Sequence, residues 1–250
     1  EFRRVLFRSK NLWAGTPKGL YRKGSKENSW SVFTIDNSGI PYNNVRVILP
    51  AKNDGILWVG TEGGIGMLNT TDNQWTKHRA FPTVEVMREE EVEWLELDGN
   101  QLWVSNWDNS MNGAIVKFDY NTLTWTRYTK EDVLLRREIP WITHVVEIKA
   151  ENRNIWFATN NGLLKYDKQK DLWHHIIKSD SDSIADNRIR HIEIDGDDVW
   201  VAHEGGVLSH YQANSKSEDW EILEAFEAEH EKEIDSIAIT KRGVWVATGS

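Results

Sequence analysis

The chain of 250 residues contains no cysteine, which excludes disulfides and thiolate metal sites. No apolar run of about 18 residues occurs, so no segment is expected to cross a bilayer as a helix. Positive charge is in deficit, because 30 Lys and Arg face 39 Asp and Glu, for a net charge of −9. Such a chain is a poor partner for nucleic acid or for an anionic membrane surface, both of which require clustered basic residues.

Tryptophan, by contrast, is abundant, and most of it is regularly spaced. Six of the 14 tryptophans sit inside a recurring pentamer, such as LWVGT at 57–61 and IWFAT at 155–159. Successive members of this series are 45, 45, 53, 44 and 45 residues apart. The six are Trp13, Trp58, Trp103, Trp156, Trp200 and Trp245, and a second series follows them at Trp30, Trp75, Trp125, Trp173 and Trp220. A period of this length predicts a repeated supersecondary unit.

Each repeat is expected to contain four short strands joined by tight turns. In 44–79, apolar segments alternate with turn signals such as Asn53-Asp54-Gly55, where glycine allows positive φ. Four antiparallel strands every 40–50 residues are typical of a β-propeller blade. The sequence therefore predicts an all-β fold, a β-propeller fragment with four complete blades and two partial ones. The predicted blades are 10–35, 44–79, 91–129, 141–178, 187–223 and 234–250.

The tryptophans of both series are expected to fill the wedges between neighbouring sheets. A small residue follows two positions after most pentamer tryptophans, as in Gly15, Gly60 and Ala158, and would allow the next sheet to approach closely. Within each repeat, the first two strands are more apolar than the last two. We therefore expect the first strand to be innermost and the fourth to lie on the rim.

The first nine residues, EFRRVLFRS, stand outside the repeat. They read like the translation of a sequencing adapter, so residues 1–9 are interpreted as a non-native scar and residues 10–250 as one propeller domain. A natural basic terminus is the alternative. The last repeat stops after two strands, which indicates an internal fragment of a longer protein.

Three segments carry a family resemblance: NIWFATNNGLLKYD at 154–167, ILWVGTEGGIGMLN at 56–69 and LWAGTPKGLYR at 12–22. They resemble the two-component regulator propeller repeat. That resemblance implies the extracytoplasmic sensor region of a bacterial, often hybrid, histidine-kinase system that responds to oligosaccharides. It also implies a periplasmic or extracellular location, with further blades and a kinase module in the parent chain. The repeats at 102–119 and 199–212 depart from the family pattern.

Candidate ligand contacts lie where loops precede a first strand or interrupt a repeat. The insertion after 102–106 carries Trp107, Asp108 and Asn109, an aromatic ring beside polar groups that suits a sugar. The alternative is a loop that packs its own tryptophan. Further candidates, which could contact ligand or merely pack or cap the strand, are Trp141, Tyr42, Asn44, Asn187 and Arg188.

The predicted function is a non-catalytic ligand-sensing or interaction module that binds a small molecule or an oligosaccharide. No catalytic residue, metal site or cofactor is predicted. One alternative is a secreted polysaccharide lyase or glycoside hydrolase, which would need carboxylates to converge at the channel mouth, as Glu93 and Asp235 could. Another is a protein-binding scaffold.

Overall fold

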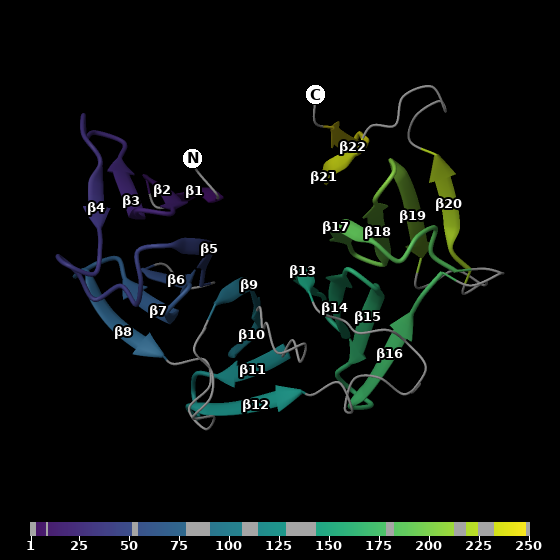
Figure 1. The fold of residues 1–250 in the computed structure, drawn as a ribbon, viewed down its shortest axis with the longest axis horizontal. Helices are drawn as coiled ribbons and strands as arrows, with labels where there is room; N and C mark the ends of the chain where they lie inside the picture. Colours follow the sequence, from purple (N-terminus) through teal and green to yellow (C-terminus); the bar gives the residue numbers. More distant parts are fainter. Residues whose placement is uncertain are drawn as a thin grey trace. The chain divides into compact units, whose positions relative to one another are not determined.

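The computed structural model describes residues 4–8, 10–51, 55–78, 91–106, 115–128, 144–178, 183–212, 219–224 and 233–248. These residues form β-strands and no helix, so none of them belongs to a helix that could cross a membrane. The strands form antiparallel sheets, five with four strands and one with two (Figure 1). The predicted fold class, four-stranded antiparallel blades without helices, is confirmed.

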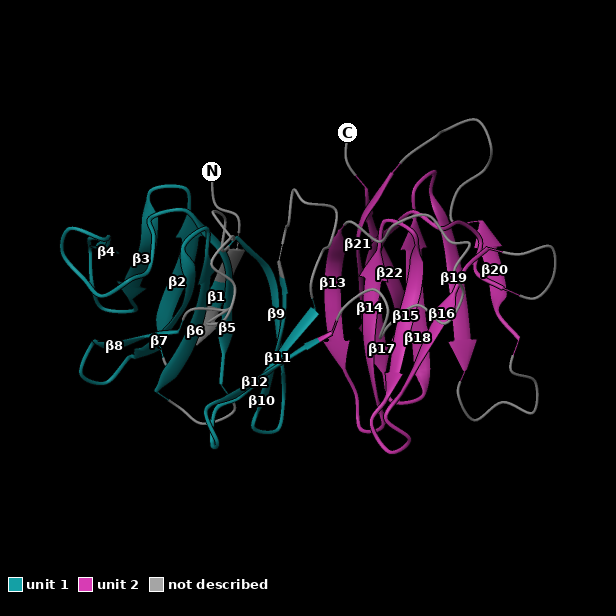
Figure 2. Ribbon diagram, turned by 60° about the horizontal axis from the view of Figure 1, so that its bottom comes forward, with its two compact units in different colours: residues 1–110, 114–127 teal, residues 111–113, 128–250 magenta. Residues whose placement is uncertain are grey.

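The chain divides into two compact units (Figure 2). Unit 1 comprises residues 1–110 and 114–127, and unit 2 comprises residues 111–113 and 128–250. Unit 1 holds three sheets, built in chain order from β1 (Arg4–Arg8), β2 (Asn11–Thr16), β3 (Gly19–Gly24), β4 (Ser31–Phe33); β5 (Val45–Pro50), β6 (Ile56–Thr61), β7 (Gly64–Asn69), β8 (Gln74–His78); and β9 (Val92–Asp98), β10 (Gln101–Asn106), β11 (Ile115–Asp119), β12 (Thr124–Tyr128).

Unit 2 repeats this arrangement. Its sheets are β13 (Val145–Ala150), β14 (Asn154–Thr159), β15 (Gly162–Asp167), β16 (Leu172–Ile176); β17 (Ile189–Asp195), β18 (Asp198–His203), β19 (Val207–Gln212), β20 (Glu221–Glu224); and the pair β21 (Ile234–Thr240), β22 (Gly243–Thr248). Each strand pairs with its neighbour in sequence, so every sheet is a meander.

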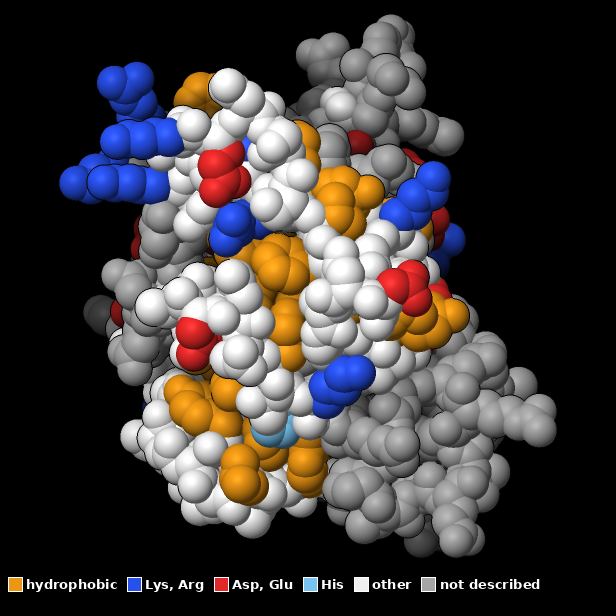
Figure 3. Space-filling model, turned by 90° about the vertical axis from the view of Figure 1, so that its left-hand side faces the viewer, with side chains coloured by type: hydrophobic (Ala, Val, Ile, Leu, Met, Phe, Trp, Pro, Cys, Tyr) orange, Lys and Arg blue, Asp and Glu red, His pale blue; other side chains and the backbone are white. Residues whose placement is uncertain are grey.

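Burial falls from the first strands of each sheet to the last. In β6 and β14 five of six residues are buried, whereas β8 and β12 have no buried residue. The first strands of neighbouring sheets contact one another within each unit, as β5 does with β9 and β13 with β17. In Figure 1, β1, β5 and β9 lie on one side of unit 1 and β4, β8 and β12 on the opposite side. On the face shown in Figure 3, hydrophobic side chains surface only in small separate patches.

The first sheet has one strand more than predicted. Arg4–Arg8, part of the segment set aside as a scar, pairs antiparallel with β2 from Arg4↔Gly15 to Arg8↔Asn11. Without this segment, β2 would present a free edge of backbone donors and acceptors, which any extended segment can satisfy. The first sheet therefore has a fourth strand from outside the predicted blade 10–35, while the origin of residues 1–9 stays a prediction.

The pentamer tryptophans differ in burial along the chain. Trp13, Trp58, Trp103 and Trp156 are at most 2% exposed, and Trp200 is half-buried. Trp245, expected to be packed, is 60% exposed. It lies on β22, beyond which the described residues contain neither a third strand nor a following sheet to cover the ring.

Small residues after these tryptophans do allow close approach between sheets. A Cβ atom on Gly15 would lie 2.7 Å from Val45 Cγ1 of the next sheet. One on Gly60 would lie 2.5 Å from Val47 Cγ1 and 2.6 Å from Val92 Cγ1, where Val92 begins the next sheet. The predicted role of glycine in sheet contact is confirmed at these two positions.

The threonine that ends the pentamer closes the turn between the second and third strands. The Oγ1 atoms of Thr16, Thr61 and Thr159 donate to the carbonyls of Gly19, Gly64 and Gly162 at 2.9, 2.8 and 2.6 Å. In the fifth sheet His203 stands at the last position of the pentamer in place of threonine. It is fully buried, and its Nε2 contacts Ser209 Oγ at 2.8 Å. Burial lowers the pKa of His203 from its ordinary 6.5 to about 4.

We expect His203 to make stability fall in mild acid. Because its folded pKa lies below its unfolded value, the unfolded chain binds more protons between those values, and stability drops as pH falls from about 6.5 to about 4. The loss amounts to about 3 kcal/mol. Urea unfolding at several pH values across this window measures the prediction. The free energy of unfolding should depend less on pH in His203→Thr and in His203→Asn than in the wild type. A wild-type slope in both variants would contradict the assignment.

Candidate functional site

The first strand of most sheets carries a β-bulge at its second residue. The register shifts there in β5, β9, β13, β17 and β21. A bulge bends the strand and redirects a side chain. The bulged residues are Arg46, Glu93, Val146, Arg190 and Asp235.

The residue before the first strand is tied to the turn that follows the pentamer. The amide of Glu62 donates to Asn44 O at 3.2 Å, that of Asn160 to His144 O at 3.1 Å, and that of Glu204 to Arg188 O at 2.9 Å. Pre-strand and turn residues therefore meet at one end of these three sheets, and the bulge residue follows the pre-strand residue by two positions. We call these the unit 1 mouth (Asn44, Arg46, Glu62, Glu91, Glu93) and the unit 2 mouth (His144, Asn160, Arg188, Arg190, Glu204, Glu233).

In the unit 1 mouth, one guanidinium group joins two sheets. Arg46 lies 3.0 Å from Glu62 Oε1 of its own sheet and also contacts Glu91, just before the first strand of the next sheet. Glu93, the bulge residue of that strand, is 3.7 Å away. The amide of Asn44 donates to Glu62. All five side chains are partly exposed, so they offer charged and amide groups to solvent while holding one another in place.

The unit 2 mouth repeats the pattern at the next-to-last sheet. Arg190 lies 3.3 Å from Oε1 of Glu204, which is in a turn of the same sheet. It also lies 3.0 Å from Oε2 of Glu233, just before β21 of the next sheet. Arg188 adds a second guanidinium at 2.5 Å from Glu204 Oε2. The side chain of Arg188 is 66% exposed, so much of its hydrogen-bonding capacity faces solvent.

Of the residues predicted from sequence, Asn44 and Arg188 belong to the mouths and Tyr42 lies beside the unit 1 mouth. Asn44 and Arg188 occupy equivalent pre-strand positions. Tyr42 is 47% exposed, and its Cβ lies against Gly63 in the turn that contains Glu62. The candidates Trp107, Asp108, Asn109 and Trp141 lie outside the described residues.

Asn187 is not part of the unit 2 mouth, although the next residue, Arg188, is. Its Oδ1 accepts a hydrogen bond from the Lys178 amide at 2.6 Å, and its carbonyl accepts one from the Gly162 amide at 2.7 Å. Asn43 holds the corresponding loop before β5 by accepting from the Ile35 amide at 2.9 Å. Asn187 therefore matches Asn43 rather than Asn44, and its side-chain oxygen fastens a loop.

Sequence reasoning missed Arg46, Glu62, Arg190 and Glu204. A straight strand alternates its side chains strictly, and the bulge that redirects the two arginines leaves no mark in the local pattern. One signal was available: in both repeats an arginine follows the pre-strand residue by two, and a glutamate directly follows the pentamer.

Deeper in unit 2, a buried charged cluster joins β13 to β17. Glu147 is 2% exposed, and its Oε2 lies 2.6 Å from His191 Nδ1 and accepts from the Ile192 amide at 3.1 Å. Lys149 Nζ lies 3.3 Å from Glu147 Oε1 and 2.8 Å from Glu193 Oε2. Burial alone would raise the pKa of Glu147, but the bond from His191, the charge of Lys149 and the Ile192 amide outweigh it and hold that pKa below its usual range.

This cluster has the features of a structural tie. Both oxygens of Glu147 are engaged, and one of them receives a backbone amide of the neighbouring first strand. His191 repeats the relation one sheet later, because its Nε2 lies 3.2 Å from the carbonyl oxygen of Ile237. Glu93 and Asp235, considered as converging acids, belong to different units. Among the described residues no three His, Asp or Glu side chains are grouped to hold a metal ion.

Solved structures with this fold align over 99% of the chain. The extracellular domain of BT4673, described as a hybrid two component system from B. thetaiotaomicron, has a TM-score of 0.70 at 20% identity. That of BT3049 from the same organism has 0.72 at 18%, and the β-propeller domain of Cps50 (Swd1) from Myceliophteria thermophila has 0.64 at 13%. The chain covers 30% and 33% of the two B. thetaiotaomicron chains and 80% of the third. Identities this low show a propeller fold alone.

No protein-family model and no curated protein matches the sequence.

Proposed function

We propose that this chain is a non-catalytic ligand-sensing part of the extracellular or periplasmic input region of a bacterial two-component receptor, and that its ligand is an oligosaccharide. The fold neighbours described as extracellular domains of such receptors support the receptor context. Since the chain spans about a third of those domains, the remaining blades and the kinase module would lie elsewhere in the parent protein.

The observation that carries the proposal is the repeated mouth. Arg46 with Glu62, and Arg190 with Glu204, present donors and acceptors held in fixed geometry at the same end of their sheets. Sugar hydroxyls both donate and accept, so paired guanidinium and carboxylate groups match them. Tyr42 adds an exposed ring beside the unit 1 mouth, where it can stack on the C–H face of a sugar. Each carboxylate already faces an arginine, which suits holding a ligand better than giving up a proton.

Glycan binding to the full chain tests this proposal. An oligosaccharide that binds the wild type on a glycan array should bind Tyr42→Ala about tenfold more weakly in calorimetry, because a stacked ring is worth about 1 kcal/mol or more. Ile222→Ala is the matched control: this apolar side chain is 54% exposed on the rim strand β20, and its loss should leave the affinity unchanged.

Two results would count against the proposal. If no glycan binds, or if Tyr42→Ala and Ile222→Ala bind alike, the mouth is not the oligosaccharide site. If the bound glycan is cleaved during incubation, the chain is an enzyme rather than a sensor.

A further inference from the structure

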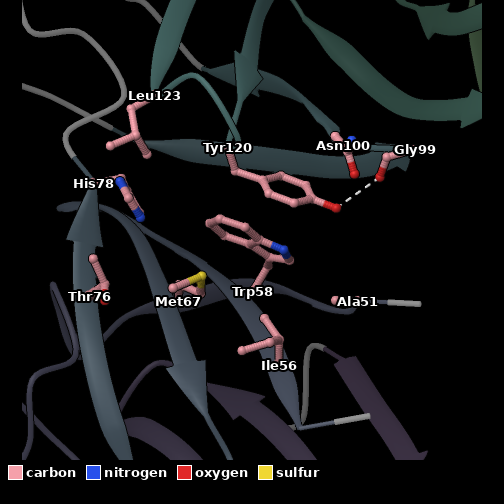
Figure 4. Close-up of a pocket in the computed structure, with 10 residues that line it drawn as sticks. All are labelled: Ala51, Ile56, Trp58, Met67, Thr76, His78, Gly99, Asn100, Tyr120 and Leu123. Atoms are coloured by element: carbon pink, nitrogen blue, oxygen red, sulfur yellow. Dashed lines mark hydrogen bonds between the residues drawn. The ribbon is translucent and has the colours of Figure 1, made fainter. Parts of the chain in front are cut away.

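Unit 1 contains a cavity away from its mouth, between its second and third sheets. Its volume is about 530 Å³, within the range of small-molecule sites. Trp58 and Tyr120 are among its ten lining residues, with ring centroids 5.9 Å apart (Figure 4). Trp58 is 1% exposed and closes the deep end, whereas Leu123, at the rim, is 66% exposed. The cavity is therefore an aromatic recess that opens to solvent.

The cavity coincides with a break in the repeat. In four sheets the pentamer tryptophan faces a basic residue or histidine across the second and third strands: Trp13 faces Arg22, Trp103 faces Lys117, Trp156 faces Lys165 and Trp200 faces His210. Both lysines lie over the tryptophan ring, with Nζ 5.6 and 5.5 Å from the centroid. His210 stacks on Trp200 at 4.2 Å.

Trp58 is the exception, because its cross-strand neighbour is Met67. Methionine carries no charge and adapts its shape, and it lines the cavity together with Trp58. Where the third and fourth sheets place a lysine over the ring, the second sheet leaves an uncharged recess.

One polar atom inside the recess lacks a partner. His78 and Thr76 lie two residues apart on β8, so both side chains point to the same face, toward the third sheet. Trp75, which precedes Thr76, packs the other way, with its ring centroid 6.1 Å from that of Phe33 in the first sheet. His78 Nε2 is buried and makes no hydrogen bond. Burial lowers the pKa of His78, which favours the neutral ring. The hydroxyl of Tyr120, by contrast, already donates to Gly99 O at 3.0 Å.

We infer that this recess binds a small planar aromatic molecule that carries a hydroxyl group, with the rings against Trp58, Tyr120 and Met67 and the hydroxyl on His78 Nε2. The aromatic walls select a flat ring, since aromatic pairs prefer offset or edge-on contact. The single unpaired nitrogen selects one hydroxyl, which can serve either tautomer of the imidazole. The site is separate from the mouth and does not rest on the proposed oligosaccharide ligand.

The probe for this inference is 2-naphthol, titrated calorimetrically into the full chain. We expect saturable one-site binding by the wild type and at least about tenfold weaker binding by Met67→Lys, which installs the lysine found over Trp103 and Trp156. Met67→Arg, which copies the pairing of Trp13 with Arg22, is the second such variant. Both substitutions already occur at this register within the chain, so the fold should tolerate them.

Two further titrations separate the parts of the inference. His78→Leu should weaken 2-naphthol about tenfold, because the ligand hydroxyl then loses its partner. Cyclohexanol, which has a hydroxyl but no flat ring, should bind the wild type at least about tenfold more weakly than 2-naphthol. Ile222→Lys is the control that adds the same charge on a rim strand of unit 2, and it should bind as the wild type does.

The inference is overturned if the wild type shows no saturable 2-naphthol binding, or if correctly folded Met67→Lys and Met67→Arg bind as well as the wild type. Unchanged binding by His78→Leu would remove the assigned role of His78. None of these results affects the Tyr42 test at the mouth, so failure of one site is distinguishable from failure of the other.

Discussion

Trp156→Ala is expected to lower the free energy of unfolding by about 3–5 kcal/mol, the usual cost of emptying a large buried aromatic site. Trp156 is 1% exposed and packs in one core cluster with Ile184, which precedes the next sheet, and with Ile192 and Val201 of that sheet. Its ring also lies 6.3 Å from that of Tyr211, and Lys165 covers it. Alanine would leave a cavity between two sheets that other contacts hold apart.

Urea unfolding followed by circular dichroism measures this change, and Trp245→Ala provides the matched control. Trp245 holds the same position in its pentamer but is 60% exposed, so its removal should change stability by no more than about 0.5 kcal/mol. Equal losses in the two variants would show that the tryptophan repeat does not stabilise the fold through burial between sheets.

Glu147→Ala is expected to cost about 3–5 kcal/mol, because it leaves buried partners of a charged cluster without their counterpart. The Ile192 amide would lose its acceptor, and His191 and Lys149 would lose a carboxylate at 2.6 and 3.3 Å. Glu147→Gln keeps an oxygen acceptor and should cost less. Denaturant unfolding at neutral pH measures both differences.

The cost of Glu147→Ala should also depend on pH. The folded pKa of Glu147 is lowered, so its stabilisation is fully present above the unfolded value near 4.5 and is lost as pH falls through the folded pKa. The gap between wild type and Glu147→Ala should therefore narrow below about pH 4.5. Glu62→Ala, which removes a partly exposed mouth carboxylate, is the comparison and should cost at most about 1 kcal/mol. A gap that stays constant into acid would contradict the role of the ionised Glu147.

Much of the fold could be read from the sequence, because local signals agreed with one another. The pentamers at 57–61 and 155–159 lie within β6 and β14, and each ends at the same residue as its strand. Alternation, turn glycines and the pentamer all indicate the same boundaries there. The strand Arg4–Arg8 could not be read from the sequence, because it carries no repeat signal, yet it satisfies the edge of β2.

The candidate site was predicted only in part. Loop position alone placed Tyr42, Asn44 and Arg188 near the end of their sheets where the mouths lie. The arginines that organise the mouths escaped notice, because a bulge is a property of strand pairing rather than of the residue pattern. For Asn187, only the hydrogen bond from the Lys178 amide shows that its side chain fastens a loop, as that of Asn43 does.

The sequence by itself determined the repeat, the strand order and the residues that fill the core, because periodic burial of tryptophan and valine is encoded locally. Only the tertiary structure decided which charges meet. Arg46 and Glu91 are separated by a whole blade in the chain, as are Glu147 and His191, and they come together because sheets stack face to face. The recess beside Trp58 also depends on this stacking. Met67 stands there at the cross-strand position where four other pentamer tryptophans face a basic residue or histidine.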